Sequence, residues 1–296
     1  MASISSKTPG TTPRETEMKV SFIGLGIMGM PMATNIAKKH DLLGYDIIKK
    51  ETPFPFASSY EECVNHADVI VTMLPKNEHV KACYAELLKY LRPGQICIDM
   101  STIFPGVSQE VAKQLEAKGV EMLDAPVVKS QPAAVKGELG IYVGGKKEVY
   151  EKMLPILSCM GKNIIYLGGH GSGLCMKILH NSLVGEIQNG VNEILGLAEK
   201  MGMDLEQVVT ALSYGGASNF YLDTKAKNIE ARDYPTAFSV ANMSKDVHFG
   251  VELAAEAGKS CPVLHHVAGV YDQAMEQGLG KSDFSASYEI VNPKGE

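Results

Sequence analysis

The chain has 296 residues, of which 45% are hydrophobic and 21% are charged, and its formal net charge is −6. This composition is typical of a folded protein, and the length is sufficient for two hydrophobic cores. The negative charge offers no basic surface for a polynucleotide, which excludes nucleic acid as a partner. No apolar run reaches the roughly 18 to 20 residues that span a bilayer, so no membrane partner is expected.

Residues 1–17 are rich in Ser, Thr and Pro and contain no apolar stretch. They resemble neither a signal peptide nor an Arg-rich transit peptide, and we predict a disordered tail. The six cysteines are scattered, with no C-x-x-C pair and no histidine partner at metal-ligand spacing. We therefore expect a cytoplasmic protein with reduced, mostly buried thiols and no bound metal.

The segment after this tail predicts a strand, a tight turn and a helix. An apolar run at residues 20–23 leads into the sequence GLGIMG at residues 24–29, and Pro31 lies in the first turn of the helix that follows. The first glycine makes the turn, the second lets a pyrophosphate approach the backbone, and the third lets helix and strand pack closely. The predicted cofactor contacts here are Gly24, Leu25, Gly26, Ile27, Met28 and Gly29.

Asp46 is the second sign of a dinucleotide site. Residues 40–45 predict the next short strand, and Asp46 follows it, about 20 residues after the glycines. A carboxylate there accepts hydrogen bonds from a ribose diol and repels a 2′-phosphate. The sequence therefore predicts NAD as the cofactor in preference to NADP.

The rest of the first domain alternates strands with helices. Pro53 and Pro55 interrupt residues 47–56, so we expect that connection to be shortened, without a long helix. Predicted strands follow at residues 68–75, 96–100, 120–126, 139–143 and 164–167, with helices at 58–67, 78–91, 105–118 and 147–158. This alternation predicts an α/β Rossmann-type fold with a doubly wound, mostly parallel sheet. The carboxyl ends of two strands place Leu74, Pro75, Ser101 and Thr102 at the ligand edge.

The pattern changes after residue 168. A glycine-rich loop leads into a helical run at residues 174–201, which is long enough to bridge two domains. Further helices are predicted at residues 203–213, 220–231, 240–258 and 263–277, with no strands between them. We therefore predict a Rossmann domain at residues 18–168 and an all-α domain at residues 169–296, joined by a long interdomain helix.

Lys177 is the candidate catalytic residue. Lys177 and Asn181 lie four positions apart, so on a helix they project from one face, which is otherwise apolar. Burial of an ammonium lowers its pKa and makes the side chain a proton donor and acceptor near neutral pH. The alternative is a solvated surface lysine. His180 lies near the same face, either as a packed core residue or as a group that tunes the site.

Five motifs occur in the order typical of one family. They are GLGIMGMPMA at residues 24–33, DMSTIFP at 99–105, DAPV at 124–127, G-x-G-x-x-x-K-x-x-x-N at 171–181, and Lys245-Asp246. Together they resemble the β-hydroxyacid dehydrogenases over residues 19 to about 282. The resemblance implies hydride transfer between a nicotinamide and the carbinol carbon of a short 3-hydroxy acid, in a homo-oligomer that is a dimer or a tetramer.

The resemblance also implies roles for individual residues. Lys177 is the general acid and base, and Asn181 holds the substrate. Ser101 or Thr102 lies between cofactor and substrate. Two further contacts follow the cofactor, namely the Leu74-Pro75 segment along its length and Lys245 at its nicotinamide end.

One loop departs from the family pattern. Where the family usually has D-A-P-V-S-G-G, this chain has DAPVVKSQ at residues 124–131. A cation at Lys129, with Ser130 and Gln131 as further donors, suits a sulfonate, and the loop is similar to that of the sulfolactaldehyde reductase branch. A small anionic substrate is therefore predicted. The carboxylate substrates of 3-hydroxyisobutyrate dehydrogenase or tartronate semialdehyde reductase, and a phosphonate, remain open alternatives.

Two other functions are disfavoured by Lys177. Imine reductase-like relatives generally replace this lysine. An NAD-sensing scaffold that binds the cofactor without turnover has no use for a proton shuttle in its cleft.

Overall fold

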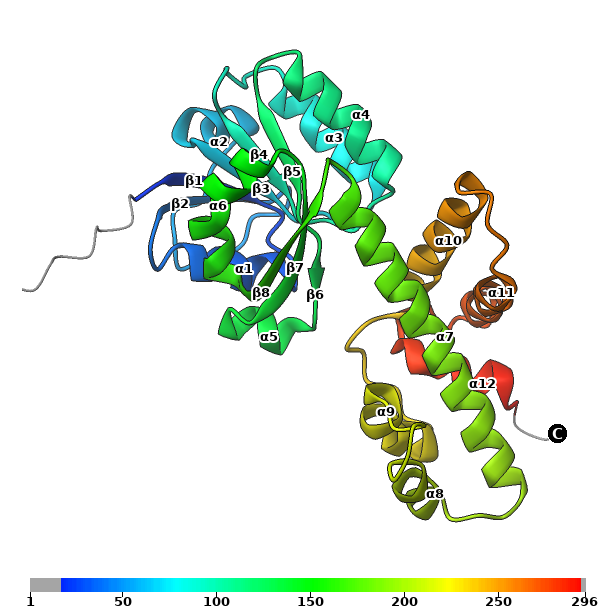
Figure 1. Ribbon diagram of the computed structural model, residues 1–296. Coiled ribbons are helices and arrows are strands. Elements are labelled where there is room, and N and C mark those ends of the chain that lie inside the picture. Colours follow the sequence, from blue (N-terminus) through cyan, green and yellow to red (C-terminus); the bar gives the residue numbers. More distant parts are fainter. Residues whose placement is uncertain (1–16, 294–296) are drawn as a thin grey trace, which may run out of the picture.

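The computed structural model describes residues 17–293. The predicted tail at residues 1–17 therefore lies, apart from its last residue, outside the described part of the chain. Within that part, an α/β layer and a group of helices are joined by one long helix, α7 (Ser172–Lys200) (Figure 1). This confirms the predicted fold class of a Rossmann-type layer followed by a helical region.

The α/β layer contains an eight-stranded sheet with the order β2-β1-β3-β4-β5-β7-β6, and β8 pairs with β7. The first five strands pair in parallel, whereas β7 is antiparallel to β5 and β6. The sheet is mostly parallel, as predicted. Its strands are β1 (Lys19–Ile23), β2 (Asp41–Tyr45), β3 (Val69–Thr72), β4 (Ile96–Asp99), β5 (Glu121–Asp124), β6 (Val127–Val128), β7 (Leu139–Gly144) and β8 (Gly161–Gly168).

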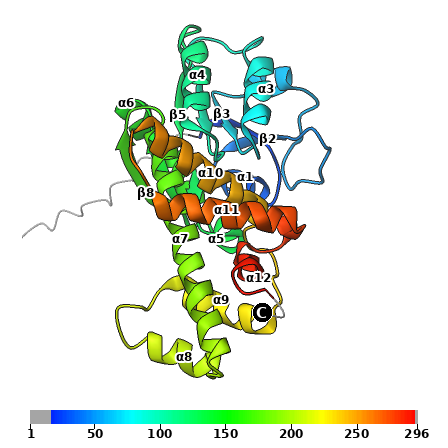
Figure 2. The same ribbon diagram turned by 90° about the vertical axis from the view of Figure 1, so that its right-hand side faces the viewer.

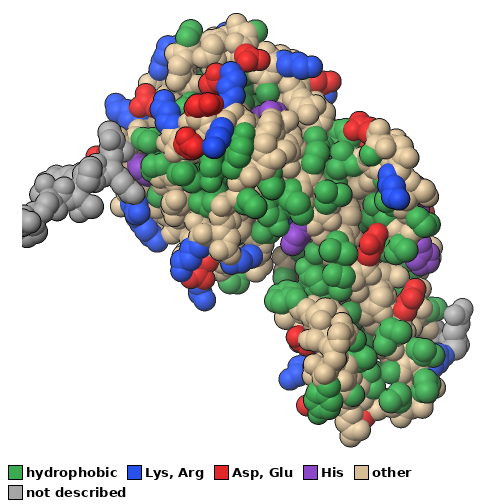
Figure 3. Space-filling model, viewed as in Figure 1, with side chains coloured by type: hydrophobic (Ala, Val, Ile, Leu, Met, Phe, Trp, Pro, Cys, Tyr) green, Lys and Arg blue, Asp and Glu red, His purple; other side chains and the backbone are tan. Residues whose placement is uncertain are grey.

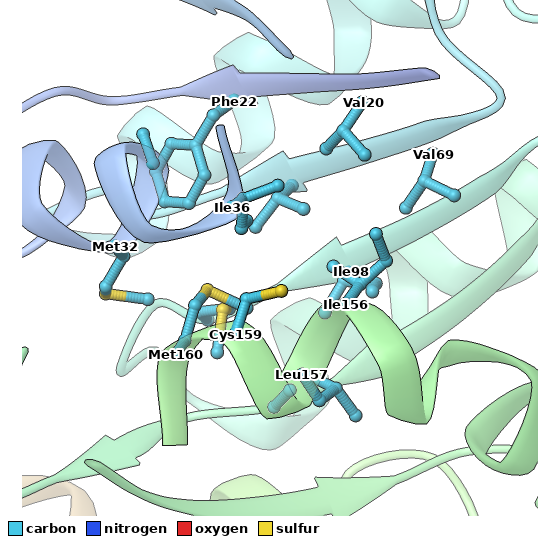
Figure 4. Close-up of a cluster of buried hydrophobic side chains, with 14 of the residues drawn as sticks. Val20, Phe22, Met32, Ile36, Val69, Ile98, Ile156, Leu157, Cys159 and Met160 are labelled. Atoms are coloured by element: carbon cyan, nitrogen blue, oxygen red, sulfur yellow. The ribbon is translucent and has the colours of Figure 1, made fainter. Parts of the chain in front are cut away.

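Helices cover both faces of the sheet because the strand side chains alternate in direction. Val20 and Phe22 of β1 point into a core beneath α1 and α6, whose buried side chains appear in Figure 4. Ile23 points to the other face, into a second core beneath α2, α3 and α4. These helices are α1 (Gly29–Ile36), α2 (Tyr60–His66), α3 (Asn77–Leu87), α4 (Pro105–Glu116) and α6 (Lys147–Met160).

The connection between β2 and α2 contains no helix, as its two prolines predicted. Between β2 and α2 the chain forms only an isolated bridge, from Phe56 to Gly44. The α2 helix begins after Ser59, whose Oγ accepts a hydrogen bond from the amide of Glu62 at 3.1 Å. The chain leaves β1 toward β2 on one side and returns to β3 on the other, so the carboxyl ends of β1 and β3 flank the topological switch point where ligands bind.

The helices of this region lie along α7 in two groups (Figure 2), and each group has its own hydrophobic core. Val184, in the first half of α7, packs with α10 and α11, whereas Leu195, in the second half, packs with α8, α9 and α12. These helices are α8 (Leu205–Leu212), α9 (Phe220–Ala231), α10 (Val240–Glu256), α11 (Pro262–Glu276) and α12 (Tyr288–Val291). Among residues 17–293, no helix combines the length and apolar character needed to cross a bilayer.

Sequence patterns did not predict two elements. Residues 120–126 were expected to form one strand, but the chain continues past Asp124 into β6, which pairs with β7. The loop expected at residues 129–131 is shorter than predicted, because Gln131 begins a helix, α5 (Gln131–Lys136). The six cysteines all lie within the described residues, no disulfide joins them, and four of them are buried as predicted.

Candidate functional site

The glycine turn has the geometry of a dinucleotide site. Gly24 has a φ of +96°, and its amide donates to Tyr45 O at 2.9 Å, which ties the turn to β2. A Cβ at Gly29 would collide with the carbonyl of Gly24, so this glycine sets the packing of α1 on β1. A Cβ at Gly26 would meet nothing within 4 Å. Packing within the protein therefore accounts for two of the three glycines, and the space at Gly26 fits a pyrophosphate.

Asp46 lies beside this turn. Its Oδ2 accepts a hydrogen bond from the amide of Leu25 at 2.8 Å, and its Oδ1 accepts from the amide of Ile48 at 3.0 Å. The side chain is half-buried and oriented by these two amides, and its remaining lone pairs can accept from a ribose diol. Ile27 in the turn is 73% exposed and Ile47 is 77% exposed. Ile27 is one of the predicted cofactor contacts, whereas Ile47 was not predicted, and these exposed apolar surfaces fit contact with an adenine ring.

The next two strand ends are joined by a buried network. Ser101 Oγ donates to Asp99 Oδ1 at 2.6 Å and accepts from the amide of Leu74 at 2.8 Å. Ser101 is fully buried, so both hydrogen bonds of its hydroxyl are made within the protein and hold Leu74 and Pro75 at the ligand edge. Thr102 is only half-buried. Of the two predicted alternatives for the position between cofactor and substrate, Thr102 is therefore the more exposed.

Asp124 fixes the start of α7 against the sheet. Its two carboxylate oxygens accept from the amides of Gly171 at 2.7 Å and Leu174 at 2.8 Å, which satisfies two donors at the helix N-terminus. A Cβ at Gly173 would lie 2.5 Å from the carbonyl oxygen of Tyr142. The G-x-G pair of the motif therefore lets α7 begin in contact with β5 and β7, and this determines where Lys177 lies one turn later.

Lys177 is buried, with 8% of its surface exposed. Its Nζ donates to Asn181 Oδ1 at 3.3 Å, so the two residues share a helix face as predicted. Burial lowers the pKa of Lys177 to about 8, while the nearby carboxylate of Asp246 raises it and the ammonium of Lys245 lowers it further. The predicted depression of the pKa is confirmed, and the surface-lysine alternative is wrong.

Asp246 on α10 connects the two sides of the cleft. Its Oδ2 accepts from Asn181 Nδ2 at 2.5 Å, and its Oδ1 accepts from Lys245 Nζ at 2.7 Å. Lys245 Nζ also donates to the carbonyl of Thr102 at 2.7 Å. The sheet edge, α7 and α10 are thus joined by one chain of charged and polar groups. Asp246 belongs to one of the five family motifs, but no role was predicted for it.

The loop expected to bind the substrate anion is exposed at Lys129, Ser130 and Gln131. Lys129 has a φ of 79°, a left-handed conformation that suits glycine, and it occupies the position where the family usually has glycine. Its Nζ donates to the carbonyl of Glu138 at 2.8 Å. Gln131 lines a cavity of about 400 Å³ together with Gly26.

His180 packs against Tyr142 of β7 and is half-buried, so it is not the fully packed core residue that was one of the two predicted alternatives. Its Nδ1 lies 3.3 Å from the Tyr142 hydroxyl. Burial and the charge of Lys177 lower the pKa of His180. The amide of Tyr142 donates to Pro126 O at 3.1 Å, three residues before Lys129.

Comparison with known proteins agrees with this geometry. A family model described as the NAD binding domain of 6-phosphogluconate dehydrogenase matches residues 19–168. A second model, described as the NAD-binding of NADP-dependent 3-hydroxyisobutyrate dehydrogenase, matches residues 171–291. The two matches together include the glycine turn, Lys177 and Asp246.

Relatives and solved structures cover nearly the whole chain. The probable mitochondrial 3-hydroxyisobutyrate dehydrogenase of Dictyostelium discoideum is 33% identical over 92% of this chain and 90% of its own length. The NAD-dependent L-serine dehydrogenase of Pseudomonas aeruginosa is 30% identical over 93% of this chain and 98% of its own. The structure of Mycobacterium tuberculosis 3-hydroxyisobutyrate dehydrogenase with L-serine, 29% identical, superposes with a TM-score of 0.84 over 93% of this chain and 99% of that one.

The fold and the cleft thus define a nicotinamide-dependent dehydrogenase that acts on CH–OH groups. These matches cover both the α/β layer and the helical region of the chain. The chain belongs to the β-hydroxyacid dehydrogenase family, and the resemblance read from its motifs is confirmed at that level.

Proposed function

We propose that the protein interconverts a short 3-hydroxy acid, or a hydroxy-sulfonate, and its aldehyde or keto form, with Lys177 as general acid and base. The observation that carries this proposal is the buried ammonium of Lys177 in contact with Asn181, with a pKa of about 8. A group with that pKa is protonated in part of the population and deprotonated in the rest near neutral pH, so it can serve both directions of the reaction.

Hydrogen-bond chemistry fixes the orientation of the Asn181 amide. Asp246 is a carboxylate and accepts only, so the NH₂ of Asn181 must face it, and the amide oxygen must face Lys177. In oxidation the neutral amine of Lys177 accepts the hydroxyl proton of the substrate. In reduction its ammonium donates a proton to the carbonyl oxygen. Bound NAD supplies the hydride acceptor, and its reduced form supplies the hydride.

Gly26 and Gly29 provide a matched test of the cofactor site. We expect Gly26→Ala to keep the thermal stability of the wild type, because the added Cβ meets nothing in the protein, but to weaken NADH binding by roughly tenfold or more. Gly29→Ala is expected to lower thermal stability, since its Cβ collides with Gly24 O. Calorimetric titration of NADH and thermal unfolding measure both effects. Unchanged NADH affinity in Gly26→Ala would place the pyrophosphate elsewhere.

The anion specificity is proposed to depend on Lys129. Its side chain is exposed and donates to the carbonyl of Glu138, so it can exchange that neutral acceptor for a charged one. A left-handed lysine costs on the order of 1 kcal/mol, which glycine at this position avoids. The chain therefore keeps a cation here at some cost in stability. This supports a strongly anionic substrate and favours the sulfolactaldehyde reductase-like activity.

A substrate panel followed by NADH absorbance tests this proposal. We expect kcat/KM for sulfolactaldehyde to exceed that for methylmalonate semialdehyde. Lys129→Ala and Lys129→Gly should each lower the sulfonate value by about 10- to 100-fold, which is the range for a lost charge-assisted contact. Lys129→Gly is the control for backbone strain, because it alone relieves the left-handed conformation. Unchanged values in Lys129→Ala would defeat this role of the loop.

A carboxylate substrate is the second candidate. It is favoured by the relatives, whose names include 3-hydroxyisobutyrate, L-serine and 2-(hydroxymethyl)glutarate dehydrogenases. In the same panel this candidate predicts that the carboxylate semialdehydes are reduced faster than sulfolactaldehyde.

A further inference from the structure

The two parts of the chain are joined by a loop built mostly from glycine. The α/β layer and the helical region form two lobes that meet beside the first part of α7 (Figure 1, Figure 3). Residues 168–173 run from the end of β8 into α7 and have the sequence GGHGSG, with φ values of +118° at Gly168 and +95° at Gly171. Glycine has wide conformational freedom, so such a loop does not by itself fix the direction in which α7 leaves the sheet.

His170 is the large side chain of this loop, and its ring contacts two other elements. Its Nε2 lies 2.9 Å from Ser108 Oγ in the first turn of α4, and its Nδ1 lies 3.3 Å from Met122 O in β5. A carbonyl only accepts, so Nδ1 carries the proton, and Nε2 of the neutral ring accepts from the Ser108 hydroxyl. Ser108 is fully buried, and the side chain of His170 is 16% exposed. One imidazole thus ties the start of α7 to α4 and β5.

Two further contacts hold the same junction. Asp124, whose carboxylate accepts from the amides of Gly171 and Leu174, lies 3.6 Å from His170 Nδ1. From α4, Gln109 Nε2 donates to His170 O at 3.3 Å. The ring and the carboxylate therefore fix successive residues of the chain, His170 and Gly171, at the point where α7 begins.

We propose that His170, through its contact with Ser108, is a positioning residue that sets where Lys177 lies relative to the cofactor edge of the sheet. This inference rests on the function proposed above. Thr102 at that edge lies six residues before Ser108, and Lys177 lies seven residues after His170. The contact therefore joins, by a short path, the segment at the ligand edge to the helix that carries the acid and base. A misplacement of about 1 Å between reacting groups can cost about 10²-fold in rate.

Ser, His and Asp are also the residue types of many nucleophilic centres. Here Ser108 is fully buried, so a substrate carbonyl does not reach its hydroxyl. The proton on His170 Nδ1 is also directed to Met122 O, which is nearer than Asp124. The arrangement therefore supports positioning and not attack by the serine.

Ser108→Ala and His170→Ala test the proposal in the full-length enzyme, with NADH and the faster aldehyde of the panel above. We expect each variant to lower kcat by about 10-fold or more. The NADH affinity should not change, because the glycine turn is untouched, and the stoichiometry of NADH binding counts the folded enzyme. His170→Gln, whose amide oxygen can accept from Ser108, should recover part of the loss.

Ser21→Ala and His66→Ala are matched controls outside the cleft. Ser21 is a fully buried serine of β1 whose Oγ donates to Cys63 O at 2.8 Å, and His66 Nε2 on α2 lies 3.3 Å from Asp41 O. The loss of these contacts should lower Tm but leave kcat per NADH site unchanged.

The pH profile shows whether the variants move Lys177 or alter its surroundings. Asn181 and Asp246 lie in the helical region with Lys177, so the midpoint for oxidation should stay near 8 while kcat falls. A midpoint that moves in both Ser108→Ala and His170→Ala would show local damage to the lysine site and would contradict the proposal.

A double-mutant cycle with Lys177→Met completes the test. If His170 acts through Lys177, His170→Ala should lower kcat in the wild type and have no further effect on the residual turnover of Lys177→Met. The proposal is overturned by wild-type kcat in both Ser108→Ala and His170→Ala, or by equal losses in the two backgrounds. Failure of the proposed function gives a different result, which is normal turnover in Lys177→Met itself.

Discussion

Lys177→Met is expected to lower kcat by roughly 10²- to 10⁴-fold and to raise the stability of the fold. The loss follows from the removal of the general acid and base, while NADH binding should persist because the glycine turn is untouched. The gain follows from burial, since methionine fills a similar volume without a charge. If Lys177 had only a structural role, Lys177→Met would instead lower the stability of the fold.

The size of the stability gain follows from the pKa of Lys177. In the unfolded chain a lysine holds its proton up to a pKa of 10.5, whereas in the folded protein this pKa is about 8. Below about pH 8 the buried charge of Lys177 therefore lowers the free energy of unfolding. This free energy rises as the pH increases from about 8 toward 10.5, because the folded protein loses the proton first. At neutral pH the difference corresponds to about 3 kcal/mol, or a rise of several degrees in Tm.

Thermal unfolding and steady-state turnover of the same preparation check both expectations. Lys152→Met, at an exposed lysine of α6, is the matched control and should change neither quantity. Normal turnover in Lys177→Met would end the catalytic assignment. A fall in Tm would show that the lysine stabilises the cleft.

Local patterns predicted the fold well because most of the α/β layer is built from contacts between neighbouring elements. Alternating apolar strands and helices gave the parallel sheet, and Pro53 and Pro55 gave the helix-free connection before α2. The antiparallel pairing of β6 and β7 escaped prediction. This pairing forms because the chain continues past Asp124, beyond the carboxyl ends of the neighbouring strands, and then pairs with β7. The local periodicity of the sequence carries no information about that contact.

The candidate site was predictable where its residues are close in sequence. Lys177 and Asn181 are one helical turn apart, and their spacing alone indicated a shared face. Asp246 is 65 positions from Asn181, and the contact exists only because α10 packs on α7. Likewise, the burial of Ser101 depends on Asp99 and Leu74, so a hydroxyl at a strand end could not be assigned to the cleft or to the network in advance.

Asp246→Asn is expected to shift the pH dependence of oxidation toward lower pH and to reduce kcat by about 10- to 100-fold. The carboxylate of Asp246 raises the pKa of Lys177, so its removal lets burial and the ammonium of Lys245 lower that pKa below about 8. The substitution also removes a charged acceptor from Asn181 Nδ2 and Lys245 Nζ. Substrate positioning and proton transfer therefore both suffer.

The pH profile separates this role from a merely structural one. In the wild type, kcat/KM for oxidation should rise with a midpoint near 8, because the reaction needs the neutral amine of Lys177, and the reduction should weaken above the same pH. Asp246→Glu, which retains the charge but displaces it, should restore the midpoint more than it restores kcat. A midpoint that stays in place or moves upward in Asp246→Asn would mean that the carboxylate does not act on Lys177, and its contacts would then serve only to hold α10 against α7.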